Sequence, residues 1–302
     1  MAKEINVSAR MVFVTDKIVA KMKKCLDKHS DREYCKHPAI EMETGMMIAT
    51  TGQMLAAHKL KDYCFEPSDG AVLGPVVMLP VEVLQMKGRV EVTVQVVDGD
   101  VLTTCTSEAG AKSELRTGTI YPRWRTVIPR TTGWPIDVDA KAWDAKLKEI
   151  VPKMNGFTMC PVRFYGEAKS ETMALSWDNP DTDDRGQMDV NVGFMPFKMW
   201  VTLNGKHLRD VMAMQPTAMR FTDSTRAVIF HGDDTLCLMM PVLTVDEPCG
   251  ADKNCLETFD LEQWIGADLG TVVVDNTKEP KHEQTLEERL REALRRQFQM
   301  AA

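Results

Sequence analysis

A strict alternation of apolar and polar residues over positions 89–96 constrains the fold of this chain more than any other feature. The valines Val90, Val92, Val94 and Val96 stand between Arg89, Glu91, Thr93 and Gln95. Because successive side chains of a β-strand point to opposite faces, the pattern predicts a strand with one buried and one solvated face. Similar short strands are predicted at 47–57, 101–107, 162–165, 173–177, 188–192, 226–230 and 236–242.

Four helical stretches interrupt these strands, at about 14–29, 79–88, 139–153 and 203–214. A chain of 302 residues is longer than a domain with a single hydrophobic core usually is. Because 44% of its residues are apolar, the chain can form two such cores. We therefore expect an α+β fold built as an internal repeat of one strand-rich unit, followed by a separate C-terminal tail.

The composition limits the classes of partner. A formal net charge of −7 argues against a protein coated in basic residues, although it leaves room for a local basic stripe. No apolar segment follows Met1, and the longest apolar run, at 71–81, is broken by Pro75 and too short for a bilayer. We expect a cytoplasmic protein with no membrane partner. The eight cysteines are irregularly spaced, so reduced thiols are expected.

The segment Gly118–Pro129 contains two prolines that constrain its structure. Pro122 and Pro129 hold the backbone extended and cannot donate to a sheet ladder. The segment is therefore predicted to be a stiff strap between two domains and not a central strand.

The first helical stretch carries a stripe of positive charge. Lys17, Lys21, Lys24 and Lys28 recur at i, i+4, i+7 and i+11 and would share one helix face. Within helical reach the only carboxylates are Asp16 and Asp27, near the ends. The stripe is either an ordinary solvated face or a surface that contacts phosphates, and its presence on an acidic protein favours the second interpretation.

Four motifs, in the family's order, resemble the bacterial sliding clamps, the DNA polymerase III beta subunits. Residues 118–129 are similar to the family's Y-P-x-[YW]-x-x-V-[IL]-P signature. Residues 48–56 resemble its ATDGHRLA strand and turn, with Thr51 and Gln53 in place of Asp and His. Residues 203–210 resemble FNxxYLLD, and residues 221–224 with 236–241 resemble the final hairpin and YLxMP terminus. The resemblance covers most of residues 5–245 and corresponds to the family's second and third domains.

This resemblance implies two tandem clamp-type domains, at 1–130 and 131–245, and a C-terminal extension at 246–302. In clamps, six such domains form a ring, with helices lining a hole for duplex DNA and antiparallel sheets outside. Two domains per chain imply a homotrimer, while a dimer or an incomplete ring stays open. Sequence-nonspecific phosphate contacts are predicted for Lys17, Lys21, Lys24, Lys28, Lys141, Lys148, Lys206 and Arg209.

Clamps also dock short peptides of replicative DNA polymerases and clamp loaders in an apolar pocket between two domains. The resemblance transfers this partner-peptide pocket to Thr50, Gln53, Leu55, Pro122, Val127, Leu238 and Met240. Such residues suit a hydrophobic anchor with a few polar contacts. The alternative is that Leu55, Val127, Leu238 and Met240 are ordinary core.

Beyond Leu243 the chain departs from the family, whose members end soon after the Met-Pro motif. A terminal amphipathic helix is predicted from Thr285, because Thr285–Glu288 fits a capping box. Its apolar face would hold Leu286, Leu290, Leu294 and Phe298. The helix packs on its own clamp, recruits a replication partner, or is a solvated appendage.

The usual catalytic constellations are missing from the sequence, which has no glycine-rich phosphate loop, nucleophile elbow or HExxH helix. The acidic clusters Asp181–Asp184 and Asp233–Asp234 are interpreted as turns. The Cys/His groups at 25–37 and 249–255 lack standard zinc spacing. We therefore predict a bacterial or phage DNA polymerase processivity factor that is not an enzyme, with no catalytic residue, cofactor or metal. The alternatives are a clamp-like partner-binding module without ring closure and a metal-dependent DNA-processing enzyme.

Overall fold

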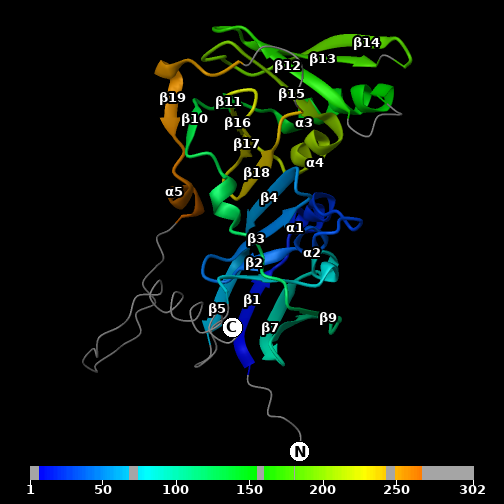
Figure 1. Cartoon of the computed structure of the whole chain (residues 1–302), viewed down its shortest axis with the longest axis vertical. Helices are drawn as coiled ribbons and strands as arrows, with labels where there is room; N and C mark the ends of the chain where they lie inside the picture. Colours follow the sequence, from blue (N-terminus) through cyan, green and yellow to red (C-terminus); the bar gives the residue numbers. More distant parts are fainter. Residues whose placement is uncertain (1–6, 68–73, 155–159, 180, 243–248, 267–302) are drawn as a thin grey trace, which may run out of the picture.

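The computed structural model describes residues 7–67, 74–154, 160–179, 181–242 and 249–266. The molecule is elongated and combines antiparallel sheets with short helices (Figure 1). Within these ranges no helix is both long enough and apolar enough to cross a membrane.

A five-stranded antiparallel sheet forms the lower end of the molecule in Figure 1. Its order is β5 (Lys61–Pro67), β1 (Val7–Val14), β7 (Arg89–Val97), β8 (Asp100–Ser107) and β9 (Lys112–Thr117). The predicted alternation lies on β7, where Val90, Val92 and Val94 are buried in the core. Val96 is 46% exposed, since it lies close to the turn that leads into β8.

An eight-stranded antiparallel sheet runs through the middle of the molecule. Its order is β11 (Ile136–Asp137), β16 (Ala218–Arg220), β17 (Val228–His231), β18 (Thr235–Met239), β4 (Met54–Lys59), β3 (Met46–Thr50), β2 (Ala39–Glu41) and β6 (Val76–Met78). The pair β18 and β4 joins strands from the two halves of the chain, with Leu238 opposite Leu55. The two halves therefore share one continuous sheet.

A four-stranded antiparallel sheet forms the upper end. Its order is β14 (Asp184–Asn191), β13 (Thr172–Asn179), β12 (Pro161–Gly166) and β15 (Met199–Asn204). On its inner face Phe164 stacks on Trp143 of a helix, with ring centroids 5.6 Å apart. Aromatic burial of this kind attaches the helix layer to the sheet.

The helices form one layer beside the sheets. They are α1 (Lys17–Lys21), η1 (Met22–Cys25), α2 (Glu33–Lys36), η2 (Val81–Gln85), α3 (Ala140–Ile150), η4 (Val151–Met154) and α4 (Gly205–Ala213), where η marks a 3₁₀-helix. Asp139 and Asn204 cap α3 and α4 by accepting hydrogen bonds from first-turn N–H groups. α3 packs on α4, which also contacts α1 and η1.

Two predicted helices are shorter than expected. The stretch 14–29 is one α-helical turn followed by η1, and the backbone is extended at Leu26. The N–H of Asp27 then donates to the carbonyl of Cys35, 2.8 Å away, so this tertiary contact replaces the helical pairing that the sequence pattern favoured. The stretch 79–88 contains only η2, which starts after Pro80 and is followed by Gly88 at a φ of 75°.

The two halves repeat one arrangement of elements. In the second half β11 and α3 precede β12–β14, then β15 and α4, then β16–β18. In the first half β1 and α1 precede β2–β4, then β6 and η2, then β7–β9, and β5 is an added strand. Matching strands also hold matching sheet positions, because β14-β13-β12-β15 corresponds to β4-β3-β2-β6 and β11-β16-β17-β18 to β1-β7-β8-β9. The expected internal repeat is therefore present.

The predicted strap and the end of the described chain lie together along one side of the molecule (Figure 1). The strap, residues 118–129, contains the short helix η3 (Trp124–Val127) and leads into β10 (Thr131–Gly133). Residues 249–266 contain η5 (Lys253–Cys255), β19 (Leu256–Thr258) and α5 (Leu261–Ile265). β19 pairs with β10, so this part of the C-terminal extension is packed on the fold and is not the separate tail that we expected.

Candidate functional site

A pocket of about 240 Å³ lies at the junction where β18 meets β4. It brings together all seven residues predicted for the partner-peptide pocket: Thr50, Gln53, Leu55, Pro122, Val127, Leu238 and Met240. The other lining residues are Arg32, Tyr34, Gly52, Met54, Tyr121, Arg123, Trp124 and Ala227. Four segments that are far apart in sequence thus form one site.

The apolar lining has a buried floor and an exposed rim. Leu55 and Leu238 are 8% and 4% exposed, whereas Val127 and Met240 are 57% and 50% exposed. The alternative that all four are ordinary core is therefore wrong for Val127 and Met240. An exposed apolar side chain beside a concave apolar floor is an arrangement that favours binding an apolar group.

The turn between β3 and β4 is fixed by its own hydrogen bonds. The hydroxyl of Thr50 donates to the carbonyl of Met54 at 2.7 Å and accepts from the N–H of Gly52 at 2.9 Å. Gly52 has a φ of 89°, a conformation that side chains with a Cβ rarely adopt. Thr50 therefore shapes the pocket wall through the turn, since its hydroxyl is already used within the chain.

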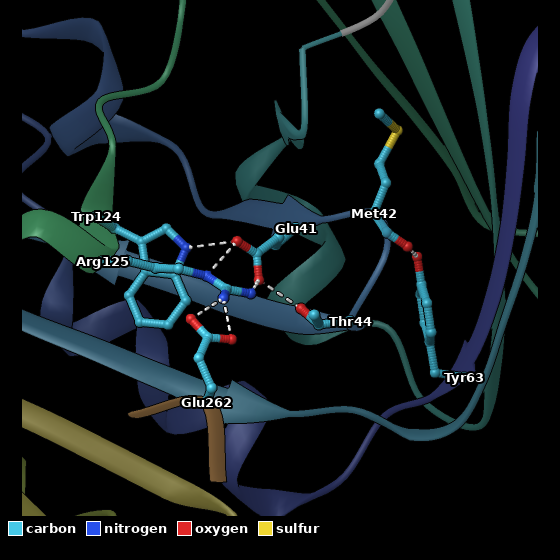
Figure 2. Close-up of polar contacts among 7 residues, drawn as sticks. All are labelled: Glu41, Met42, Thr44, Tyr63, Trp124, Arg125 and Glu262. Atoms are coloured by element: carbon cyan, nitrogen blue, oxygen red, sulfur yellow. Dashed lines mark hydrogen bonds and ion pairs between the residues drawn. The ribbon is translucent and has the colours of Figure 1, made fainter. Parts of the chain in front are cut away.

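Arg125 of η3 fastens the strap on two sides, as Figure 2 shows. Its Nε and Nη2 donate to the two carboxylate oxygens of Glu41 at 2.9 and 2.6 Å, and its Nη1 donates to Glu262 at 2.6 Å. The indole N–H of Trp124 also donates to Glu41, at 3.3 Å. Glu41 is on β2 and Glu262 is on α5, so one arginine connects the strap with the first repeat and with the C-terminal extension.

The extension is attached to the same region by aromatic contacts. The indole N–H of Trp264 donates to the carbonyl of Gly232 at 2.8 Å, and the ammonium of Lys59 lies 4.6 Å from the Trp264 ring centroid. Phe259 packs on His231, with ring centroids 5.6 Å apart. These contacts hold the extension against β17, the turn between β17 and β18, and the end of β4. The helix predicted from Thr285 lies outside the described residues.

Sequence reasoning missed several residues of this region. Tyr121 and Trp124 belong to the strap signature, so the signature could have suggested them as pocket residues. Arg32 and Tyr34 come from the segment around α2, which no motif marked. Arg125 carried no sequence signal either, because its partners Glu41 and Glu262 are 84 and 137 positions away.

The lysines predicted on the first helical stretch do not form one continuous stripe. Lys17 and Lys21 lie on α1 and Lys24 on η1, but Lys28 lies beyond the helical turns. The ammonium of Lys21 donates to the carbonyl of Ala213 at 2.7 Å, and Lys24 pairs with Asp210 of α4 at 3.1 Å. Lys17 and Lys28 are exposed, and neither has an ion-pair partner within the described ranges.

The cations of α3 and α4 are also partly paired. Lys148 and Arg209 both approach Asp144, at 2.6 and 3.6 Å. Lys141 and Lys206 are exposed. All the predicted phosphate contacts except Lys28 lie on α1, η1, α3 and α4, which pack together, and Lys28 follows η1 by three residues.

In the described part of the chain, neither cysteine group belongs to a set of three or more His, Cys, Asp or Glu side chains that could hold a metal ion. The thiols of Cys249 and Cys255 donate to the carbonyl oxygens of Lys198 and Pro196, at 3.7 and 3.5 Å. Cys25 and Cys35 are buried as free thiols. Burial raises the pKa of both thiols, which makes them poor nucleophiles at neutral pH.

No family model and no curated protein sequence matches the chain. Solved structures do match. The DNA polymerase III subunit beta of Pseudomonas aeruginosa has a TM-score of 0.61 at 15% identity, over 81% of this chain and 69% of that chain. The DNA polymerase sliding clamp of Caulobacter crescentus has a TM-score of 0.59 at 18% identity, over 81% and 68%. The Helicobacter pylori beta clamp bound to a DNA ligase peptide has a TM-score of 0.61 at 11% identity, over 81% and 68%.

Proposed function

Since the chain has the sliding-clamp fold, we propose that it is a DNA sliding clamp, a processivity factor that encircles duplex DNA and tethers a replicative DNA polymerase and other replication proteins to it, with a clamp loader as a further partner. The observation that carries this proposal is the pocket at the junction of the two repeats, where all seven predicted residues meet. The similar Helicobacter pylori clamp binds a DNA ligase peptide, which supports a peptide-binding role for a protein of this fold. The proposed domains are 1–130 and 131–245, joined by the strap.

The internal repeat supports the proposal of a closed ring. Within the chain, the last strand of the second repeat, β18, pairs with β4 of the first. The strands that correspond to them are β9 of the first repeat and β14 of the second, and both are sheet edges in the described part of the chain. If β9 of one copy pairs with β14 of the next, each copy repeats its internal junction, and three copies supply six units. Edge strands are well suited to such pairing because their backbone groups are open.

The surface formed by α1, η1, α3 and α4 is the proposed DNA-facing surface. Its cations would contact phosphates without reading bases, so binding would be independent of sequence and would weaken steeply with salt. The net charge of −7 leaves the rest of the surface acidic, which would repel DNA elsewhere. Such a protein needs no catalytic residue or cofactor.

Light scattering over a concentration series tests ring formation. We expect a closed oligomer of three times the 34.0 kDa chain mass. The same sample should be retained on nicked circular DNA and lost when the DNA is linearised, because a ring slides off a free end. A persistent monomer would favour the alternative, a clamp-like partner-binding module without ring closure. DNA cleavage that EDTA abolishes would favour the metal-dependent enzyme.

A further inference from the structure

The pocket has an electrostatic character that its apolar floor does not reveal. Among its lining residues are two guanidinium groups, Arg32 and Arg123, and no carboxylate. Both arginines are exposed, and neither guanidinium has a hydrogen-bond or ion-pair partner among the residues that the structure describes. On a protein of net charge −7, the pocket therefore carries a local excess of positive charge.

Three carboxylates of the region are already engaged with other cations. Glu41 and Glu262 both bind Arg125, on the same strap as Arg123 (Figure 2). Glu33, next to Arg32 in sequence, pairs with Lys36 and His37 at 3.6 and 3.2 Å. In the described part of the chain, neither pocket arginine has a carboxylate within ion-pair distance.

A buried hydroxyl adds a second, independent observation. Tyr121 lines the pocket and is 6% exposed, and its hydroxyl has no hydrogen-bond partner in the described structure. Burial raises the pKa of Tyr121, so the group stays protonated and able to donate. A buried hydroxyl without a partner is destabilising, and a ligand oxygen that accepts from it would remove that penalty.

We propose, on the basis of the proposed function, that the pocket selects acidic partner peptides in which a carboxylate lies beside an apolar anchor. The anchor occupies the floor formed by Leu55 and Leu238, next to Val127. Arg32 and Arg123 bind the carboxylate at the mouth, and the hydroxyl of Tyr121 donates to a peptide oxygen. Charge-assisted bonds at such a rim discriminate between partners more than they add affinity.

Two fluorescent peptides test this selection on the full-length protein. Both carry a Leu-Phe anchor, followed by Asp in one and by the isosteric Asn in the other. Fluorescence anisotropy should show about tenfold tighter binding of the Asp peptide at low salt, and added KCl should reduce the difference. Equal affinities would overturn the proposal while leaving a peptide-binding pocket. Failure of both peptides to bind would overturn the proposed function of the pocket as well.

Variants assign the selection to named residues. Arg32→Gln and Arg123→Gln should each reduce the preference for Asp over Asn. Arg130 lies between the strap and β10 and does not line the pocket, so Arg130→Gln should leave the preference unchanged. Tyr121→Phe should weaken both peptides about fivefold with no loss of thermal stability, because the hydroxyl has no internal partner. An unchanged preference in both arginine variants would contradict the assignment.

The chain's own tail is the competing occupant. A third peptide that copies residues 285–302 should not displace the Asp peptide from the full-length protein. Displacement by this peptide, together with equal binding of the Asp and Asn peptides, would assign the pocket to the tail and overturn the proposal of an acidic partner.

Discussion

The pocket and the cation-bearing helices, α1, η1, α3 and α4, present their positive charges differently. In the pocket, Arg32 and Arg123 have no internal partner within the described ranges, while the structural carboxylates are bound by Arg125. On the helices, Lys24 pairs with Asp210, and Lys148 pairs with Asp144. The lysines along one helix therefore overstate the positive charge available to a ligand. Carboxylates on the neighbouring helix or on the same helix neutralise some of them, and the lysine spacing alone does not reveal this.

The two regions also differ in how they are fixed. The strap forms one wall of the pocket, and Arg125 fixes the strap by binding Glu41 and Glu262. The helices are fixed by their buried apolar residues, and their exposed cations lie at the ends of long side chains. We expect substitution of Arg125 to act on stability, because it fixes the strap, and substitution of the exposed pocket residues to act on peptide binding. Substitutions of the helix cations should act on long-range attraction, and their effects should depend on salt.

The largest effect is expected from Arg125→Ala. It would leave the carboxylate of Glu41, which is 7% exposed, without its ion-pair partner, and only the neutral donors Trp124 and Thr44 would remain. Removing one member of a buried pair should lower the free energy of unfolding by about 3 kcal/mol. Urea unfolding followed by tryptophan fluorescence measures this change. The matched control is Arg123→Ala on the same strap, for which we expect a change within about 0.5 kcal/mol. Similar losses in the two variants would mean that the strap is not fixed by Arg125.

The next effect is expected from Val127→Glu, which places a charge on the exposed apolar rim. Because Val127 is 57% exposed, the fold should tolerate the change. Peptide affinity should fall by about thirtyfold, the loss of about 2 kcal/mol typical of an interface anchor. Val96→Glu, at another exposed valine on β7, is the matched control and should bind normally in the same anisotropy assay. Normal binding by Val127→Glu would remove the rim from the site.

The pocket could be predicted from the sequence to a greater extent than the helix surface. Pro122, Val127, Leu55 and Leu238 stand in short motifs that resemble those of bacterial sliding clamps, and the resemblance implied their place in one pocket. By contrast, the partners of Lys24 and Arg125 are Asp210 and Glu262, which only the tertiary fold brings close. The strand pattern predicted most of the sheets, but it gave no indication that residues 256–258 add to β10.

A smaller effect is expected from acid, acting on the C-terminal extension behind the pocket. Nε2 of His231 accepts from Nε of Arg220 at 3.1 Å, and the ring packs on Phe259. Burial, together with the charge of Arg220, lowers the pKa of His231 to about 4 from 6.5. The unfolded chain therefore takes up a proton first as the pH falls, and stability decreases between about pH 6.5 and 4.

At pH 5.5 this linkage should cost about 1 kcal/mol relative to pH 7. Urea unfolding at the two pH values measures the cost, and His231→Gln, which cannot take up a proton, should show a smaller decrease. The charges that face His231 from neighbouring elements are Arg220, Asp233 and, through Arg220, Glu257. An equal decrease in both proteins would assign the acid sensitivity to other groups.

The smallest effects are expected on the cation-bearing helices, and they test the comparison most directly. If an unpaired lysine contacts a phosphate, then Lys17→Ala should reduce by about 1 the slope of log affinity against log salt concentration for duplex DNA. Lys28→Ala should do the same. Lys24→Ala should reduce the slope less, because Asp210 already offsets the charge of this lysine.

Lys253→Ala, in the C-terminal extension, is the control and should leave the slope unchanged. Titrations of labelled duplex at several KCl concentrations measure the slopes. Equal reductions for Lys17, Lys24 and Lys28 would mean that DNA displaces the internal carboxylate, and that pairing within the protein does not determine which cations a phosphate meets.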